Sequence, residues 1–177
     1  MGRIQKCTLA GGCFWCTEAI YQEVKGVTAV ISGYSGGTTD SPTYDEMHHS
    51  DSGHAEAVQL AFDPKVITYE QILQIFYYVH DPTTLNRQGN DVGEEYRSVI
   101  FYHDEEQKRI AEDVTRNFAT KLWSDPIVTE IVPLEKFWPA EDFHQNFYRN
   151  NPQLPYCQVI INPKLEKFRK KFESFLK

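Results

Sequence analysis

Two cysteines three residues apart carry the clearest chemical signal in the sequence. Cys13 and Cys16 lie in the stretch GGCFWC, after two glycines and at the start of a helical pattern, with Phe14 and Trp15 between them. The free N–H groups and the dipole at a helix N-terminus stabilise a thiolate, the reactive form of cysteine. This position suits a nucleophile with a resolving partner, a thiol–disulfide exchange pair, or part of a metal site.

Three of the possible interpretations fit the pair less well. A structural zinc site needs four ligands, and Cys157 and the scattered histidines would have to complete the single CxxC. Disulfide exchange of the thioredoxin kind suits a helix start, but two bulky aromatic residues inside the motif are unusual for it. Two buried structural cysteines would explain neither the preceding glycines nor the helix start.

Glu56 is the second residue that predicts chemistry. Residues 54–62 alternate as in a strand, and Glu56 shares one face with His54, Val58, Leu60 and Phe62. A carboxylate among apolar neighbours is costly unless it is paired or protonated, and a protonated carboxyl group in an aromatic pocket is what a general acid requires. The stretch GNDVGEEYRS adds Asp91 and Tyr96 near the start of another strand.

Alternating helices and strands must position these side chains. We expect strands at residues 4–10, 27–35, 54–62, 97–103 and 127–133, and helices at 13–24, 69–80, 104–123 and 164–177. Exposed loops should occupy 35–53 and 81–96, and loops of this length are often functional. The pattern predicts an α/β or α+β layered fold, with helices packed on a mixed sheet. We expect residues 1–177 to form a single domain.

The composition narrows the class of protein. The 177 residues include 14% aromatic side chains, some of which could line a pocket, and the net charge of −7 argues against binding nucleic acid. We find neither a signal peptide nor an apolar run long enough to span a membrane, so we expect a cytoplasmic protein. In that compartment the four cysteines are more consistent with free thiols that have a chemical function than with a disulfide framework. Nothing in the sequence predicts an obligate oligomer, and we expect a monomer.

The chain resembles the peptide methionine sulfoxide reductases of the A type. The resemblance covers nearly the whole chain, in one order, and is carried by GGCFWC (11–16), GVTAVISGYSGG (26–37), SPTY (41–44), GHAEAV (53–58), HDPTTLNRQGNDVGEEYRS (80–98), FHQNFY (143–148) and PYCQVII (155–161). It implies a two-layer α/β sandwich with a ferredoxin-like core, and a single catalytic domain over residues 1–177.

The resemblance also implies roles for individual residues. Cys13 matches the nucleophile and Glu56 the acid that protonates the sulfoxide oxygen. Phe14 and Trp15 match the pocket for the terminal methyl group of the substrate. The remaining matches are Tyr44 and Tyr96, the phenols that hold the oxygen, and Asp91, a supporting carboxylate.

The implied reaction reduces methionine S-sulfoxide, free or in oxidised proteins and peptides, and so repairs oxidised proteins under oxidative stress. Cys13 becomes a sulfenic acid, a second thiol converts it into a disulfide, and an external dithiol such as thioredoxin or dithiothreitol restores the enzyme. No metal or organic cofactor is needed. A general disulfide oxidoreductase is the closest alternative, and it would reduce disulfides and ignore sulfoxides.

The sequence departs from the family pattern at two places. Many relatives carry glycine where this chain has Cys16 and use a resolving thiol near the C-terminus, whereas Cys16 and Cys157 are both available here. We expect Cys16 to resolve first, because it lies one helical turn from Cys13. The stretch MHHSDS before GHAEAV also differs, and the sequence assigns no role to His48, His49 or Cys7.

Overall fold

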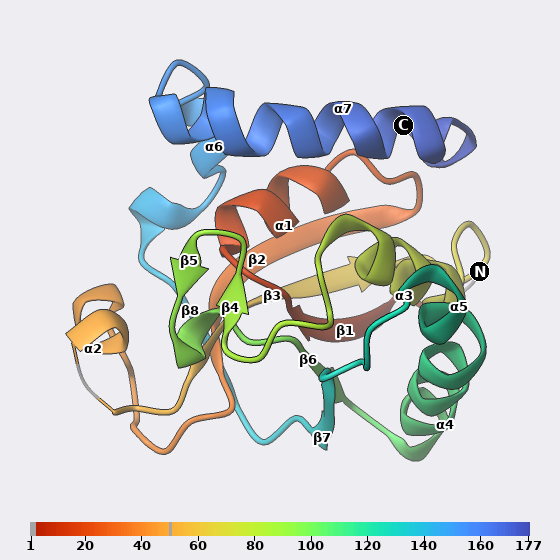
Figure 1. Cartoon of the computed structure of the whole chain (residues 1–177), viewed down its shortest axis with the longest axis horizontal. Coiled ribbons are helices and arrows are strands. Elements are labelled where there is room, and N and C mark those ends of the chain that lie inside the picture. Colours follow the sequence, from red (N-terminus) through yellow and green to blue (C-terminus); the bar gives the residue numbers. More distant parts are fainter. Residues whose placement is uncertain (1–2, 50) are drawn as a thin grey trace.

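The computed structural model describes residues 3–49 and 51–177, which form a six-stranded mixed sheet with helices packed on it (Figure 1). The strands are β1 (Gln5–Ala10), β2 (Val27–Ser35), β3 (Ala55–Phe62), β6 (Val99–Tyr102), β7 (Glu130–Pro133) and β8 (Phe137–Pro139), in the spatial order β7-β6-β1-β3-β2-β8. Among the described strands, only β6 and β7 pair in parallel. The expected layered fold with a mixed sheet is confirmed.

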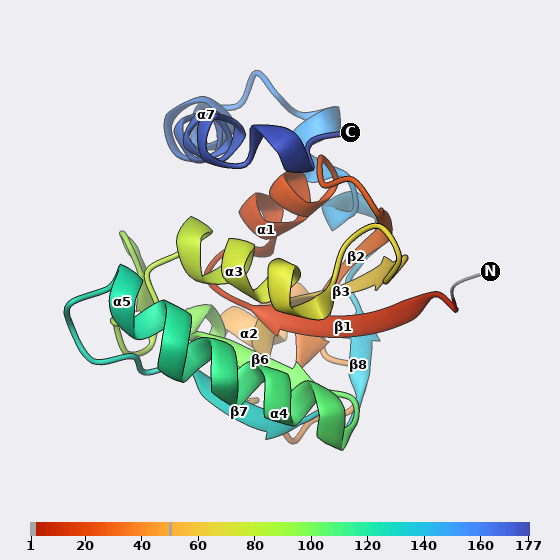
Figure 2. The same ribbon diagram turned by 90° about the vertical axis from the view of Figure 1, so that its right-hand side faces the viewer.

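The helices are α1 (Phe14–Tyr21), α2 (Tyr44–His49), α3 (Tyr69–Val79), α4 (Glu105–Val114), α5 (Thr120–Leu122), α6 (Phe147–Asn150) and α7 (Asn162–Lys171). Helices α1 and α3 lie over the central strands, α4 lies beside β6 and β7, and α7 covers the outer side of α1 (Figure 2). Among the described residues, no helix is long and apolar enough to cross a bilayer.

The main core lies between the sheet and these helices. Leu9 of β1, Leu60 of β3, Tyr21 of α1 and Phe76 of α3 are all essentially inaccessible to solvent. Burying a side chain of this size contributes about 1.5–3 kcal/mol. A second, smaller cluster lies on the opposite face of the sheet and contains Ala10, Ala55, Ala57, Val99 and Phe101. The central strands are therefore covered on both faces where they approach the Cys13 loop.

Helix α1 is buried on almost every side. All its residues except Trp15 are buried, because the helix lies between the sheet and α7. Burial on all sides removes the usual amphipathic pattern and leaves a short, almost uniformly packed helix. Such a helix presents its first turn to the site as a rigid element.

Several elements were not predicted from the sequence pattern. Helix α2 and the hairpin β4 (Arg87–Gln88) and β5 (Asp91–Val92) occupy the two expected loops. Strand β8 pairs with the edge of β2, and the expected helix 104–123 is divided by a π-helical turn at Thr115–Ala119. Two of these elements, α2 and the β4–β5 hairpin, carry residues of the candidate site.

Candidate active site

Cys13 occupies the N-cap position of α1, directly after Gly12. Its side chain is 8% exposed, and the backbone N–H of Cys16 donates to the Cys13 carbonyl at 3.1 Å, which closes the first turn. The Cys13 and Cys16 thiols lie close enough that each changes the pKa of the other. The structure thus brings together the two thiols that the CxxC spacing predicts to be neighbours, and both are free.

The buried environment changes the proton affinity of both thiols. Burial raises the pKa of Cys13, and the contact with Cys16 and the nearby Glu56 carboxylate raise it further. The hydrogen bond from Cys13 lowers the pKa of Cys16. Burial therefore opposes the stabilisation of a thiolate that a helix N-terminus provides.

Glu56 reaches this first turn from the sheet. Strand β3 pairs Glu56 with Tyr34 of β2, and the side chain points toward α1 with 1% of its surface exposed. The backbone N–H of Phe14 donates to its Oε1 at 3.1 Å. Burial raises the pKa of Glu56, although contacts with His48 and the Phe14 amide oppose the shift. The predicted inward orientation of Glu56 is confirmed by this geometry.

His48 contacts the other oxygen of Glu56. Its Nε2 lies 3.3 Å from Glu56 Oε2, and its Nδ1 lies 3.3 Å from Glu95 Oε1. The contact with Glu56 raises the pKa of His48, and Glu95 adds to the shift. The sequence pattern gave no role to His48, yet the His48 ring bridges two carboxylates of the site.

A local signal for this placement was present in the sequence. Thr43 and Glu46 form a capping box, in which the Glu46 N–H donates to Thr43 Oγ1 at 3.2 Å and the Thr43 N–H donates to Glu46 Oε2 at 3.3 Å. This box starts α2 and places Tyr44 and His48 four residues apart on one helical face. A helix predicted here would have placed His48 beside Tyr44.

Two phenols flank the Glu56–His48 pair. The ring of Tyr44 lies 4.2 Å from that of His48, and the ring of Tyr96 lies 5.9 Å away on a neighbouring turn. Burial and the Glu56 carboxylate raise the pKa of Tyr44 to about 12, and the same two causes raise the pKa of Tyr96. Both phenols therefore keep their protons at neutral pH and can donate hydrogen bonds to an oxygen in the site.

Asp91 lies on the Cys16 side of the site. The hydroxyl of Tyr156 donates to Asp91 Oδ2 at 3.0 Å and lies 3.9 Å from the Cys16 sulfur. Asp91 is thus connected to the thiol pair through a tyrosine that the sequence analysis missed. The only available signal for Tyr156 was its position next to Cys157.

Aromatic rings form one wall of the site. Trp15 stacks on Phe147 with 3.6 Å between ring centroids, and its indole N–H donates to His144 Nδ1 at 3.0 Å. Phe14 is buried against His144 and Tyr34 at 5.2 and 5.7 Å. The two aromatic residues of the CxxC thus lie beside the cysteines with their orientations fixed by the 143–148 segment.

Cys157 lies behind this arrangement. Its side chain is fully buried at the start of the π-helical turn Cys157–Ile161, directly after Tyr156. Burial raises the pKa of Cys157, and the nearby Cys16 adds to the shift. Cys7, in contrast, lies in the core on β1 and takes no part in the site.

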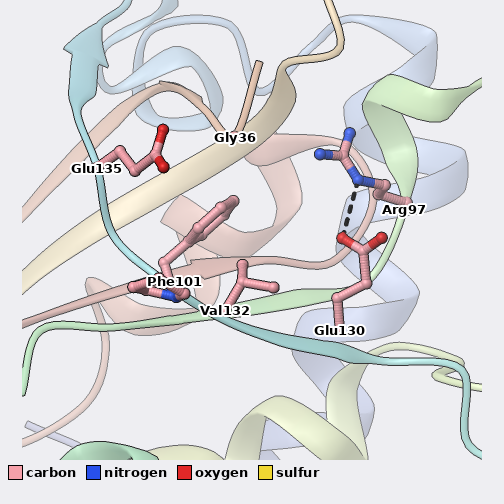
Figure 3. A pocket seen from close by; sticks show the side chains of 7 residues that line it. Gly36, Arg97, Phe101, Glu130, Val132 and Glu135 are labelled. Carbon is pink, nitrogen blue, oxygen red and sulfur yellow. Dashed lines mark hydrogen bonds and ion pairs between the residues drawn. The ribbon is translucent and has the colours of Figure 1, made fainter. Parts of the chain in front are cut away.

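Within residues 3–49 and 51–177, no group of three or more His, Cys, Asp or Glu side chains could hold a metal ion. A hollow of about 450 Å³ lies on the opposite face of the sheet and is lined by Arg97, Glu130, Phe101, Val132, Pro133, Glu135 and Gly36 (Figure 3). Arg97 and Glu130 pair within it at 3.2 Å, and neither cysteine of the CxxC lines it.

Known proteins resemble this chain in both sequence and fold. The family model for peptide methionine sulfoxide reductase matches residues 5–176. The chain belongs to the peptide methionine sulfoxide reductase family. Enzymes of this family are oxidoreductases, and the resemblance stated from the sequence motifs is confirmed.

Individual relatives of this reductase family support the assignment. The chain is 56% identical over 165 residues to peptide methionine sulfoxide reductase MsrA of Sulfolobus acidocaldarius, covering 93% of each chain. It is 51% identical over 170 residues to the Thermus thermophilus MsrA, covering 96% of each. The solved structure of reduced Mxr1 from Saccharomyces cerevisiae matches with a TM-score of 0.82 at 35% identity, covering 88% of this chain and 90% of that one.

A further reductase structure was solved with a partner. Mxr1 of Saccharomyces cerevisiae in complex with Trx2 matches with a TM-score of 0.60 at 28% identity, covering 82% of this chain and 85% of that one. The lower TM-score than that of reduced Mxr1 indicates that the backbone of that complex differs more from the present fold.

Proposed function

We propose that this chain reduces methionine S-sulfoxide, free or within oxidised proteins and peptides, with Cys13 as the nucleophile and Glu56 as the general acid. One observation carries the proposal. The backbone N–H of Phe14, the first residue of α1, donates to Glu56, and Cys13 occupies the N-cap position of the same turn. A buried acid and a thiol thereby approach the same small volume beside an aromatic wall. Family membership supports the choice of sulfoxide as the substrate.

In the first step the Cys13 thiolate attacks the sulfoxide sulfur, and Glu56 gives its proton to the sulfoxide oxygen. The attack joins the Cys13 sulfur to the substrate sulfur, and the protonated oxygen then moves to the Cys13 sulfur as the S–S bond and the original S–O bond break. Methionine leaves as the thioether, and Cys13 is left as a sulfenic acid. A protonated Glu56 is neutral, so it no longer opposes ionisation of Cys13. Protonated Glu56 therefore supplies the proton for the sulfoxide oxygen and also makes the Cys13 thiolate easier to form.

The phenols and the aromatic wall would orient the substrate. Tyr44 and Tyr96 hold their protons and can donate to the oxygen as it gains charge. Phe14 and Trp15 suit the terminal methyl group because their rings are apolar and held in place. One pocket that fixes methyl, oxygen and main chain accepts one hand of the sulfoxide, and the family implies the S epimer.

A second thiol then completes the cycle. Attack by Cys16 on the Cys13 sulfenic acid forms a Cys13–Cys16 disulfide and releases water. Cys157 would then attack the Cys16 sulfur, which forms a Cys16–Cys157 disulfide and frees the Cys13 thiol. Thioredoxin would return the two electrons, and Mxr1 in complex with Trx2 supports this partner. The cycle uses no organic cofactor or metal, and Asp91 would support the Cys16 side through Tyr156.

The wider setting follows from the same reaction. We propose that residues 1–177 act as one catalytic domain, as a monomer in the cytoplasm, in the repair of oxidised proteins. Binding of nucleic acid or membrane has no part in this function.

The proposal is tested with the two separated sulfoxide epimers of N-acetyl-methionine and dithiothreitol as reductant. The wild-type protein should reduce the S epimer and leave the R epimer, and Cys13→Ser should lose all turnover because a hydroxyl is a poor nucleophile at neutral pH. Cys7→Ser is the matched control, because Cys7 is a buried thiol outside the site. Equal rates on both epimers, turnover by Cys13→Ser, or reduction of insulin disulfides without sulfoxide reduction would contradict the proposal.

A further inference from the structure

His48 is placed between the buried acid and a more accessible carboxylate. Glu56 Oε2 lies 3.3 Å from its Nε2, and Glu95 Oε1 lies 3.3 Å from its Nδ1. The three side chains are 1%, 18% and 16% exposed in the order Glu56, His48, Glu95. The row therefore leads from a closed interior position to the rim of the site.

The inner contact has a particular geometry. His48 Nε2 is shut off from solvent and makes no aligned hydrogen bond with any described residue, although Glu56 is within ion-pair distance. A small rotation of the ring would align the two atoms. An imidazolium has one exchangeable proton at each nitrogen, so it can hold one carboxylate through one N–H and release the other proton to the second carboxylate.

We propose that His48 is a positioning residue that acts through Glu56 and supplies the proton that Glu56 transfers to the substrate oxygen. This inference rests on the proposed role of Glu56 as the acid. In each cycle the His48 imidazolium passes its Nε2 proton to the Glu56 carboxylate and remains neutral, with its Nδ1 proton directed at Glu95. Glu56 then gives that proton to the sulfoxide oxygen, and His48 regains a proton from solvent after the product leaves.

The neighbours of His48 make this exchange favourable. Two carboxylates flank the ring, and together they raise the pKa of His48, while burial opposes the shift. The charged and titratable groups that face it come from four elements and are Glu56 (β3), Glu95 and Tyr96 (the 94–96 turn), Tyr44 (α2) and His144 (the 142–144 turn). The pair of Glu56 and His48 therefore holds its last proton to a higher pH than Glu56 alone would.

This chemistry predicts a pH signature in the reduction step. Reduced enzyme is mixed with N-acetyl-methionine S-sulfoxide in a single turnover, and the rate is followed from pH 5.5 to 9. The rate should rise as Cys13 ionises and fall as the acid loses its proton. In His48→Gln the falling limb should move to lower pH, so the loss is small at pH 6 and about tenfold or more at pH 8.

Three further variants make the result interpretable. His49→Gln is the matched control, because His49 is the adjacent histidine, with a 73% exposed side chain, and its profile should coincide with the wild type. Glu95→Gln keeps the imidazole and removes the outer carboxylate, so its falling limb should move in the same direction by less. Glu56→Gln should lose about 10²-fold across the whole pH range.

The outcomes separate the two proposals. If Glu56→Gln is impaired but His48→Gln follows the wild-type profile, or loses the same factor at every pH, the role of His48 is wrong and that of Glu56 stands. If Glu56→Gln reacts at the wild-type rate, Glu56 is not the acid and both proposals are wrong. A lowered falling limb in His48→Gln and in Glu95→Gln supports the proton supply without depending on one variant.

Discussion

Glu56 and Cys13 are linked because each is costly to ionise where it lies. Glu56 is 1% exposed and Cys13 is 8% exposed, and burial raises the pKa of both. A negative charge on either group makes a negative charge on the other less favourable, because the Glu56 carboxylate raises the pKa of the Cys13 thiol. Glu56 and Cys13 together therefore favour a state with one negative charge and one proton. The proposed nucleophilic attack on a sulfoxide requires this combination.

At the residue scale, the order in which the cysteines react can be measured. Cys16 is in direct contact with the Cys13 thiol, whereas Cys157 is fully buried at the start of the C-terminal π-helical turn. After one equivalent of sulfoxide without reductant, Cys157→Ser should lose two thiols and form a bridge between Cys13 and Cys16, as read by peptide mass mapping. Cys16→Ser should instead accumulate the Cys13 sulfenic acid, which dimedone traps.

Cys7→Ser provides the reference for this experiment. Cys7 is fully buried in the core, so its removal should leave the bridge pattern of the wild type. If Cys157→Ser accumulates sulfenic acid while Cys16→Ser forms a disulfide at the wild-type rate, Cys157 is the first resolving thiol and the proposed order is reversed.

Gly12 controls how two elements meet at the site. Its φ of +87° is a conformation that favours glycine, and a Cβ atom there would lie 2.7 Å from the Gln88 side chain. Gln88 belongs to the β4–β5 hairpin and is fixed by two hydrogen bonds with the backbone of Asp81, at 2.8 and 2.9 Å. The hairpin that carries Asp91 can therefore pack directly on the Cys13 loop.

At the element scale, we expect Gly12→Ala to be damaging for two reasons. Alanine is strained at this φ, which costs about 1 kcal/mol or more, and its methyl group displaces Gln88. Urea unfolding should report lower stability than the wild type, and kcat/KM should fall because Asp91 and Tyr156 move with the hairpin.

Gly89→Ala separates the two effects. Gly89 also has a positive φ, of +58°, but a Cβ atom there would meet nothing within 4 Å. This variant should show the backbone strain alone and keep the wild-type kcat/KM. Equal kinetic losses in both variants would mean that contact between the hairpin and the Cys13 loop is unimportant.

The sequence predicts elements well where one periodic pattern is long enough to identify them. Alternation gave the correct face for Glu56 on β3, and the Thr68–Gln71 capping box marks the start of α3. Strand β8 has three residues and ends in proline, so it shows no periodicity of its own and exists because the edge of β2 is available to pair.

Sites assembled from distant segments are harder to predict than elements. Cys13 and Glu56 were identifiable because each is unusual in its own local pattern. Tyr156 and His144 are ordinary in theirs and gain meaning only from the partners that the fold supplies, namely Asp91 and Trp15. His48 was missed because a short helix, α2, was read as a loop.

At the scale of the whole molecule, His80 joins three parts of the structure. Its Nδ1 donates to the Phe76 carbonyl at 2.5 Å, and its Nε2 lies 2.8 Å from the Ser98 hydroxyl at the start of β6. A Cβ atom on Gly11 would lie 3.0 Å from its ring, so the backbone before Cys13 rests on it. Burial lowers the pKa of His80 to about 4.

This histidine should make stability depend on pH. A pKa lowered from 6.5 to about 4 means that the unfolded chain binds a proton in this range that the folded chain does not. Stability is therefore fully present above pH 6.5 and is lost as the pH falls toward 4, by about 3 kcal/mol from this group.

The contribution is isolated by comparing variants. The free energy of unfolding is measured in urea at pH 7 and pH 5 for the wild type, His80→Gln and His49→Gln. The wild type and His49→Gln should lose similar stability at pH 5, whereas His80→Gln, although less stable at pH 7, should lose less. An unchanged pH dependence in His80→Gln would show that His80 is not the group responsible.

The pocket can form only after the C-terminal segment has been synthesised, because Trp15 stacks on Phe147 and Cys16 contacts Tyr156. The cysteine pair emerges from the ribosome first, and Tyr156 is synthesised 140 residues after Cys16, on the order of ten to thirty seconds later. During that interval the chain has its thiols but lacks one wall of the pocket. Selective sulfoxide chemistry therefore begins only after the C-terminal segment has folded back, and a nascent chain exposes cysteines that meet the surrounding oxidants without their pocket.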